Sequence, residues 1–243
     1  MNRIKAITTA TENESGLTSR MLDYTLKYNI NQIDDFLIAT DFQSPEVEKV
    51  CNKYNMPFIK TSKFYENNAV FDKGKVISYM LKGIKTGWVL HIDCDILLPK
   101  NFKEKINNVN LDKNKLYGAR RIMFEDLKKS EAWFNDNENP ENLCDLIPYG
   151  YCWGYFQLFH MDSPQIKLSD PDNIYPASGH AGDSDGWFRN KWGSMKEKSY
   201  KKGQFLPEKD DLIVIGEIEE LPFLVGHLGH SSVNNNLNKS FFN

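Results

Sequence analysis

The feature that most constrains the fold is the alternation of short apolar runs with amphipathic segments over the first hundred residues. Apolar runs occupy residues 4–9, 36–39, 57–59 and 88–92, and segments with helical signals lie between them at 17–28, 45–54 and 75–85. Ser44 followed by Pro45 is typical of a helix start. Such alternation indicates βαβ units. The sequence therefore predicts an α/β fold with a central mixed, mostly parallel sheet flanked by helices.

The second half of the chain is less regular. Residues 116–124 and 212–218 are predicted strands, 128–142 a surface helix and loop, and 183–192 a short helix. Residues 149–161 are rich in aromatic side chains and are expected in the middle of the sheet. Residues 163–178 contain three prolines and are predicted to form a loop. Because no repeat or linker divides the sequence, we expect one domain over residues 1–243.

Composition excludes several classes of protein. The chain of 243 residues is 40% hydrophobic, and its formal net charge of -3 gives no overall attraction to nucleic acid or to an anionic membrane. Its four cysteines are scattered, which argues against a zinc site or a disulfide framework and for a reducing compartment. No apolar run is long enough to serve as a signal peptide or to span a membrane. We therefore expect a cytoplasmic protein.

The strongest functional signal is the segment 88–99, in which a hydrophobic strand ends in Asp93-Cys94-Asp95. Alternate side chains of a strand share a face, so the two carboxylates are expected to converge on one site. Hard oxygen ligands of this kind suit Mg²⁺ or Mn²⁺, which can bridge to a diphosphate. A solvated turn with two surface acids is the alternative, and the apolar residues on both sides of the segment argue against it.

Together with Lys73-Gly74 at the start of a helix, this strand resembles the donor-binding half of the GT-A glycosyltransferases. The resemblance implies a donor half over about residues 1–100 and an acceptor half over about 101–243. It implies that Asp93 contacts the nucleotide ribose or the metal, that Asp95 binds the metal, and that Lys73 lies near the nucleotide. It implies a nucleotide diphosphate sugar as donor, with UDP the first expectation, and Mn²⁺ or Mg²⁺ as cofactor. The donor-binding set it implies is Thr9, Glu12, Asp41, Lys73, Asp93 and Cys94.

For Thr9, Glu12 and Asp41, a helix cap or a turn is an equally good interpretation.

A second cluster at residues 179–189 resembles the segment in which inverting GT-A enzymes carry their base. Asp185 matches the general base and Asp183 is its rival, although Asp183 also suits a helix cap. Ser184 stands where those enzymes usually have Glu.

A third cluster at residues 223–231 contains two histidines in a Gly-bearing segment. Imidazole can complete a carboxylate site for Mn²⁺, and many GT-A enzymes use a C-terminal histidine in this way. His227 matches best and His230 is the alternative.

Aromatic and amide side chains are suited to binding a sugar acceptor, and packing in the core is the alternative role for the aromatic ones. The candidates for acceptor binding are Trp153, Gln157 and Trp187.

The resulting hypothesis is a metal-dependent, inverting glycosyltransferase whose acceptor is unknown. A retaining enzyme would use the same donor site without Asp185 as base. A nucleotidyltransferase is disfavoured because residues 10–13 are not a Gly-rich phosphate loop. Two further alternatives are a sugar-nucleotide-binding module without activity and a phage-type enzyme that glycosylates modified DNA bases in the host cytoplasm. The acceptor could also be a glycan, a lipid-linked sugar or a protein.

Overall fold

A computed structural model describes residues 3–12, 16–124, 126–136, 152, 154–177, 181–194, 213–214 and 217–228. Its first hundred residues alternate between strands and helices, as predicted. The elements are β1 (Ile4–Thr9), α1 (Leu17–Asn29), β2 (Asp35–Thr40), α2 (Pro45–Lys53), β3 (Phe58–Lys60), the 3₁₀ helix η1 (Lys63–Asn68), α3 (Lys73–Leu81) and β4 (Trp88–Ile92). Ser44 precedes α2 as predicted, but its side chain does not cap that helix.

The remaining elements agree less closely with the prediction. They are β5 (Ile96–Leu97), α4 (Phe102–Asn107), β6 (Lys115–Phe124), α5 (Leu127–Asp136), β7 (Phe156–His160), α6 (Pro164–Lys167), α7 (Ala181–Arg189), β8 (Gly193–Ser194), β9 (Ile213–Val214) and β10 (Glu217–Leu228). The sequence did not predict β5, α4, α6 or β8. Helix α6 starts inside the predicted loop because Pro164 occupies a first-turn position, where its missing N–H costs nothing.

Eight strands form the main sheet in the order β3-β2-β1-β4-β7-β6-β10-β5. Strand β7 is antiparallel to both neighbours and β5 is antiparallel to β10, whereas the other pairs are parallel. The part of the aromatic-rich segment that forms β7 is thus in the middle of the sheet, as predicted. A two-stranded sheet pairs β8 with β9.

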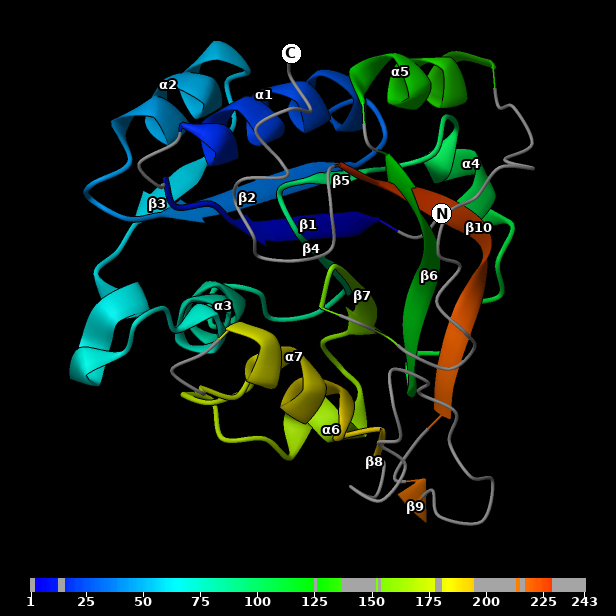
Figure 1. Cartoon of the computed structure of the whole chain (residues 1–243). Helices are drawn as coiled ribbons and strands as arrows, with labels where there is room; N and C mark the ends of the chain where they lie inside the picture. The colour runs from blue at the N-terminus through cyan, green and yellow to red at the C-terminus, as the bar shows by residue number, and fades with distance from the viewer. Residues whose placement is uncertain are drawn as a thin grey trace, which may run out of the picture.

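Helices cover both faces of the sheet (Figure 1). One face packs on α1, α2 and α4 through Leu26, Val47 and Phe102, and the other packs on α3 and α7 through Ile77 and Phe188. Every residue of β4 is buried, as expected of a central strand covered on both sides. The predicted fold class, a mixed and mostly parallel sheet flanked by helices, is therefore confirmed.

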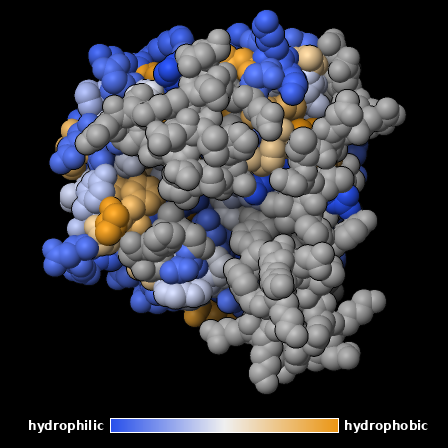
Figure 2. All heavy atoms as spheres, in the orientation of Figure 1, coloured by the Kyte–Doolittle hydropathy of each residue, from blue (hydrophilic) through white to orange (hydrophobic). Residues whose placement is uncertain are grey.

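Among the described residues, no helix combines the length and the apolar character that crossing a membrane requires. On the face seen in Figure 2, the described surface is largely hydrophilic, with a few hydrophobic side chains at its left between α2 and η1. The exposed large hydrophobic residues include Phe42, Val70, Leu168 and Trp187.

Candidate functional site

The turn that carries Asp93, Cys94 and Asp95 follows β4 directly and is fixed by main-chain hydrogen bonds. The N–H of Asp93 donates to the carbonyl of Tyr155 (3.1 Å), and the N–H of Ile96 donates back to the carbonyl of Asp93 (3.2 Å). Helix α1 holds the other side of this turn, where Oγ1 of Thr25 donates to the carbonyl of Cys94 (2.7 Å). The two carboxylates therefore lie at the carboxyl end of the sheet, where open α/β sheets bind ligands.

The side chains of Asp95 and His227 lie close together because strands β5 and β10 are paired. Ile96 is opposite His227 in this ladder, and the N–H of Leu228 donates to the carbonyl of Asp95 (3.0 Å). As a result Nε2 of His227 lies 3.3 Å from Oδ2 of Asp95. Burial alone would raise the pKa of Asp95, but the charge and hydrogen bond of His227 hold it below its ordinary value. The other carboxylate oxygen, Oδ1, is buried and has no hydrogen-bond partner.

Lys73 brings two further carboxylates together at the start of α3. Its buried Nζ lies 2.6 Å from Oδ1 of Asp93 and 3.4 Å from Oδ1 of Asp185. Burial opposes the charge on Lys73, yet Asp185 and Asp93 raise its pKa above the ordinary value. Burial raises the pKa of Asp93 to about 6, while Lys73 acts in the opposite direction. Lys73 and Asp93, two of the six predicted donor-binding residues, thus lie in one charged cluster with the predicted base Asp185.

The residues around Lys73 explain its placement. Asp72 caps α3, since its Oδ1 accepts from the N–H of Lys75 (3.0 Å). Gly74 is required because a Cβ there would lie 1.9 Å from the carbonyl oxygen of Pro176. The Lys73-Gly74 pair therefore lets the loop before α7 pass directly over the start of α3.

Of the two candidate bases on α7, only Asp185 joins the cluster. Its side chain is 15% exposed and contacts Lys73, whereas Asp183 is exposed to solvent. Trp187, four residues after Asp183, is 50% exposed and therefore lies on the same outer face of the helix.

Three buried residues behind Asp185 carry polar side chains, and Gln157 is the one among them with a role predicted from the sequence. The hydroxyl of Tyr175 lies 2.5 Å from Oδ1 of Asp185, 2.8 Å from Oε1 of Gln157 and 3.3 Å from Nδ1 of His91. Gln157 is fully buried, so it supports the cluster from behind and does not line an open acceptor wall. No motif marked Tyr175 or His91, because these contacts exist only in the folded chain.

Among the described residues, no group of three or more His, Cys, Asp or Glu side chains is close enough to hold a metal ion. Asp93 does not complete the Asp95–His227 pair, because its carboxylate is engaged by Lys73. The pair nonetheless suits a divalent cation: a carboxylate oxygen and an imidazole nitrogen face each other, and Oδ1 of Asp95 has no partner. The cluster also has a net negative charge, because it contains three carboxylates (Asp93, Asp95 and Asp185) and one ammonium group (Lys73). A divalent cation would neutralise that charge.

Glu12 and Asp41 make hydrogen bonds of the helix-cap and turn kind, which was the alternative interpretation for them. The two carboxylate oxygens of Glu12 accept from the N–H groups of Thr18 (3.1 Å) and Ser19 (3.0 Å) at the start of α1. Asp41 accepts from Oγ of Ser44 (2.6 Å), and its other oxygen accepts from the hydroxyl of Tyr65 (2.7 Å). Thr9 is buried at the end of β1.

Three candidates complete the predicted set. Cys94 is partly buried between the two aspartates, and burial together with the charges of Asp95 and Asp93 raises the pKa of its thiol well above the ordinary value. Trp153 and His230 lie outside the described residues.

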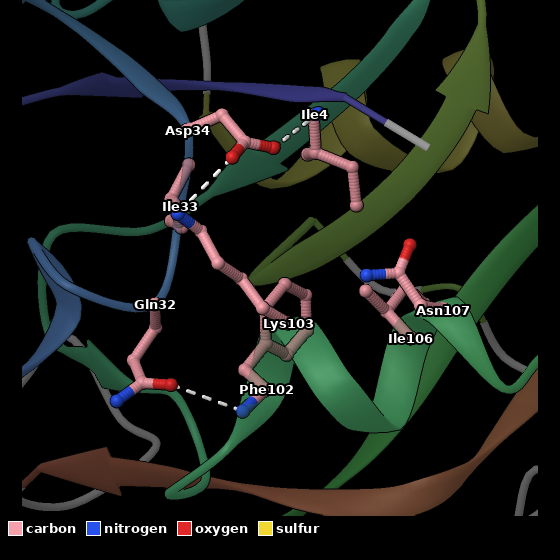
Figure 3. Close-up of a pocket in the computed structure, with 8 residues that line it drawn as sticks. All are labelled: Ile4, Gln32, Ile33, Asp34, Phe102, Lys103, Ile106 and Asn107. Carbon is pink, nitrogen blue, oxygen red and sulfur yellow. Dashed lines mark hydrogen bonds and ion pairs between the residues drawn. The ribbon is translucent and has the colours of Figure 1, made fainter. Parts of the chain in front are cut away.

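A small hollow lies at the opposite edge of the sheet, at the amino ends of β1 and β2 (Figure 3). Asp34 closes one side of it by accepting from the N–H of Ile4 (3.1 Å) and pairing with Lys103 (3.0 Å). It contains none of the residues of the charged cluster and is separate from the candidate site. Its lining comprises Ile4, Gln32, Ile33, Asp34, Phe102, Lys103, Ile106 and Asn107.

No protein-family model matches the sequence, and a search of curated proteins finds no match. Among solved structures, the chain is similar to a glucosyl-3-phosphoglycerate synthase of Mycobacterium tuberculosis (10% identity, 98% of this chain, 76% of that chain, TM-score 0.48). It is also similar to a putative glucose-1-phosphate thymidylyltransferase from Bacillus anthracis (10% identity, 98% of this chain, 93% of that chain, TM-score 0.49).

A third similar structure is a mannosyltransferase of Pyrobaculum calidifontis in complex with GDP-Man and Mn²⁺ (10% identity, 71% of this chain, 50% of that chain, TM-score 0.43). With TM-scores under 0.5, these likenesses say nothing about what this chain does. Its own sheet order, with antiparallel β7 in the middle, has the α/β architecture that the resemblance to GT-A proteins predicts.

Proposed function

We propose that the protein is a metal-dependent glycosyltransferase that moves a sugar from a nucleotide diphosphate sugar, with UDP as the first expectation, to an acceptor hydroxyl. The observation that carries the proposal is the convergence of Lys73, Asp93 and Asp185, from three separate segments, beside the Asp95–His227 pair. A buried cluster of this kind, rich in carboxylates and placed at the carboxyl edge of the sheet, is typical of a functional site.

We assign the metal, Mn²⁺ or Mg²⁺, to Asp95 and His227. The unpartnered buried Oδ1 of Asp95 supports this assignment, since a buried carboxylate oxygen is costly unless it is paired. A bound divalent cation supplies Lewis-acid stabilisation of the charge that develops on a leaving diphosphate. His230 remains the alternative histidine.

Asp93 and Lys73 are assigned to the donor. Asp93 is partly exposed and can accept a hydrogen bond from a ribose hydroxyl, while Lys73 holds its carboxylate in place from the buried side. We propose that Thr9, Glu12, Asp41 and Cys94 form the nucleoside side of the site, because they lie at or just after strand ends on the same edge of the sheet. Because the carboxylates of Glu12 and Asp41 already accept protein hydrogen bonds, we expect them to shape this region and to contact the donor only secondarily.

Asp185 is assigned as the general base that takes the proton from the acceptor hydroxyl. It lies in the cluster and is partly exposed, whereas the rival Asp183 is on the outer face of α7. Attack by the deprotonated hydroxyl on the anomeric carbon, opposite the leaving diphosphate, would invert the configuration. Trp187 and Trp153 remain proposed acceptor contacts.

A thermal-shift screen of nucleotide sugars, starting with UDP-glucose and GDP-mannose and run with and without Mn²⁺, tests this function. A donor at about a hundred times its Kd stabilises the folded state by about 2.7 kcal/mol, which raises the Tm by roughly 5–10 °C. We expect one donor class to give this shift only with Mn²⁺, and we expect Asp95→Ala to abolish it. Asp23→Ala, which removes a surface pair with Lys53 away from the cluster, is the matched control.

An Asp95→Ala protein that retains the full Mn²⁺-dependent shift would contradict the metal assignment. A panel in which no nucleotide sugar shifts the Tm of the wild-type protein would contradict the proposed function itself. With a responding donor, release of the nucleoside diphosphate then measures turnover. We expect Asp185→Asn to lose that turnover while the shift is retained.

A further inference from the structure

Tyr175 lies at the centre of the polar residues that surround Asp185. It is fully buried in the loop before α7, and its ring stacks on Phe188 of α7 with centroids 4.3 Å apart and planes inclined by 20°. Its hydroxyl reaches Oδ1 of Asp185 (2.5 Å) on one side and Oε1 of Gln157 (2.8 Å) on the other. The tyrosine thus connects the carboxylate on α7 to the central strand β7.

The amide of Gln157 has a defined orientation. Its Nε2 donates to the carbonyls of Cys152 (2.9 Å) and Asp185 (3.3 Å), and both of these groups are acceptors only. Oε1 of Gln157 must therefore face Tyr175 and can only accept a hydrogen bond from it.

The hydrogen bonds that the hydroxyl of Tyr175 can make depend on whether Asp185 is ionised or protonated. The hydroxyl of Tyr175 carries one proton, but an ionised Asp185 and Oε1 of Gln157 are both acceptors. With Asp185 ionised, the hydroxyl can donate to only one of them. With a proton at Oδ1 of Asp185, the carboxyl donates to the hydroxyl and the hydroxyl donates to Gln157, so that both short contacts are satisfied.

We propose that Tyr175 is a positioning residue for Asp185, donating to its carboxylate before the reaction and accepting from its carboxyl group afterwards. The proposal rests on the proposed function, in which the acceptor hydroxyl gives its proton to Asp185. In that step the O–H bond of the acceptor breaks as an O–H bond forms at Oδ1 of Asp185, which neutralises the carboxylate. The new carboxyl group then donates to the hydroxyl of Tyr175, whose own proton turns from Asp185 to Gln157. The charge of Lys73 favours the ionised state, whereas the hydroxyl of Tyr175 can donate to the carboxylate and accept from the carboxyl group.

Tyr175→Phe tests the proposal because it keeps the ring that stacks on Phe188 and removes only the hydroxyl. The probes are UDP-glucose and GDP-mannose with Mn²⁺, and the readouts are the Tm shift, the KM for the donor and the rate of nucleoside diphosphate release. We expect the release rate to fall at least about tenfold, with the Tm shift and the KM unchanged, because a misplaced base slows chemistry without weakening donor binding.

Tyr24→Phe is the matched control. It also removes a buried tyrosine hydroxyl, which bonds to Oγ of Ser130 (2.8 Å) away from the cluster, and we expect it to leave the release rate unchanged. A Tyr175→Phe protein that releases nucleoside diphosphate at the wild-type rate would overturn the proposal. So would a fall in rate matched by a higher KM and a smaller Tm shift, since that pattern indicates a general structural role.

A double-mutant cycle makes a second test that needs no donor. If Tyr175 positions Asp185, then Asp185→Asn should change the urea midpoint much less in the Tyr175→Phe background than in the wild type. Additive effects on the midpoint would overturn the proposal even for a protein that turns over neither probe. If no nucleotide sugar shifts the Tm of the wild-type protein, that result counts against the proposed function. The double-mutant cycle still decides whether Tyr175 positions Asp185.

Discussion

Gly154 shows at the residue scale how closely the chain packs around the proposed base. A Cβ at this position would lie 1.7 Å from Oδ2 and 1.8 Å from Cγ of Asp185. Because a carboxylate can rotate away, we expect Gly154→Ala to displace Asp185 and to cost about 1–3 kcal/mol of stability, as overpacking does. We expect nucleoside diphosphate release to fall at least about tenfold, since small displacements of a catalytic group are costly. Release assays and urea unfolding would measure the two effects.

Gly186→Ala is the matched control for this change, because Gly186 is next to Asp185 on α7 and its added Cβ would meet no atom within 4 Å. Alanine is the better helix former by about 1 kcal/mol, so this variant should be slightly more stable and equally active. If the two alanine variants lost the same activity, the contact between Gly154 and Asp185 could not explain the loss.

At the scale of elements, α1 holds the segment that follows β4. Asn29 donates through Nδ2 to the carbonyl of Ile96 (2.8 Å), and its Oδ1 accepts from the N–H of Leu98 (2.9 Å). Both bonds are buried, so Asn29→Ala leaves two buried main-chain groups without partners, at about 1–3 kcal/mol each. We expect urea unfolding to show that the free energy of unfolding falls by about 2–5 kcal/mol.

The control is Asn52→Ala, at an exposed site on α2, which should change the free energy of unfolding by less than about 0.5 kcal/mol. Equal losses in the two variants would contradict this role of Asn29.

Strands and helices with a clear period were predictable from the sequence, and elements that depend on distant partners were not. Strands β1, β2 and β4 and helix α1 follow their patterns, but β10 extends ten residues beyond the predicted end of its strand at residue 218. Pro222 argues against a strand because it lacks an N–H. The ladder accommodates it through a shift in register with β6 between Glu220 and Leu224.

The same distinction holds for the candidate site. The Asp93-Cys94-Asp95 motif and the helix start at Lys73 could be found because each lies in one short segment. The hydroxyl contact of Tyr175 with His91 spans 84 residues of sequence, and the contact of Gly154 with Asp185 depends on how a turn packs against a helix. Such contacts are decided by tertiary packing, which a local sequence pattern does not record.

At the scale of the whole molecule, the edge of the sheet opposite the charged cluster provides a pH-sensitive contact. His160 ends β7 there, and its Nδ1 accepts from the N–H of Asp162 (3.1 Å), which requires an unprotonated Nδ1. Burial lowers the pKa of His160 below its ordinary value, against the charge of Asp162. Between the folded and unfolded pKa values the unfolded chain binds more protons. The stabilisation is therefore present above the unfolded value of about 6.5 and is lost as the pH falls.

His160→Asn isolates this contribution, because an amide oxygen can accept the same hydrogen bond and does not titrate. Urea unfolding at about pH 7.5 and about pH 5.5 would measure the change in the free energy of unfolding for both proteins. We expect the wild-type protein to lose about 1 kcal/mol more than the variant on acidification, the usual net contribution of one hydrogen bond. His91, fully buried with its pKa well below the ordinary value, acts in the same direction in both proteins and cancels in the comparison. Equal losses in the two proteins would show that protonation of His160 does not break its bond to Asp162.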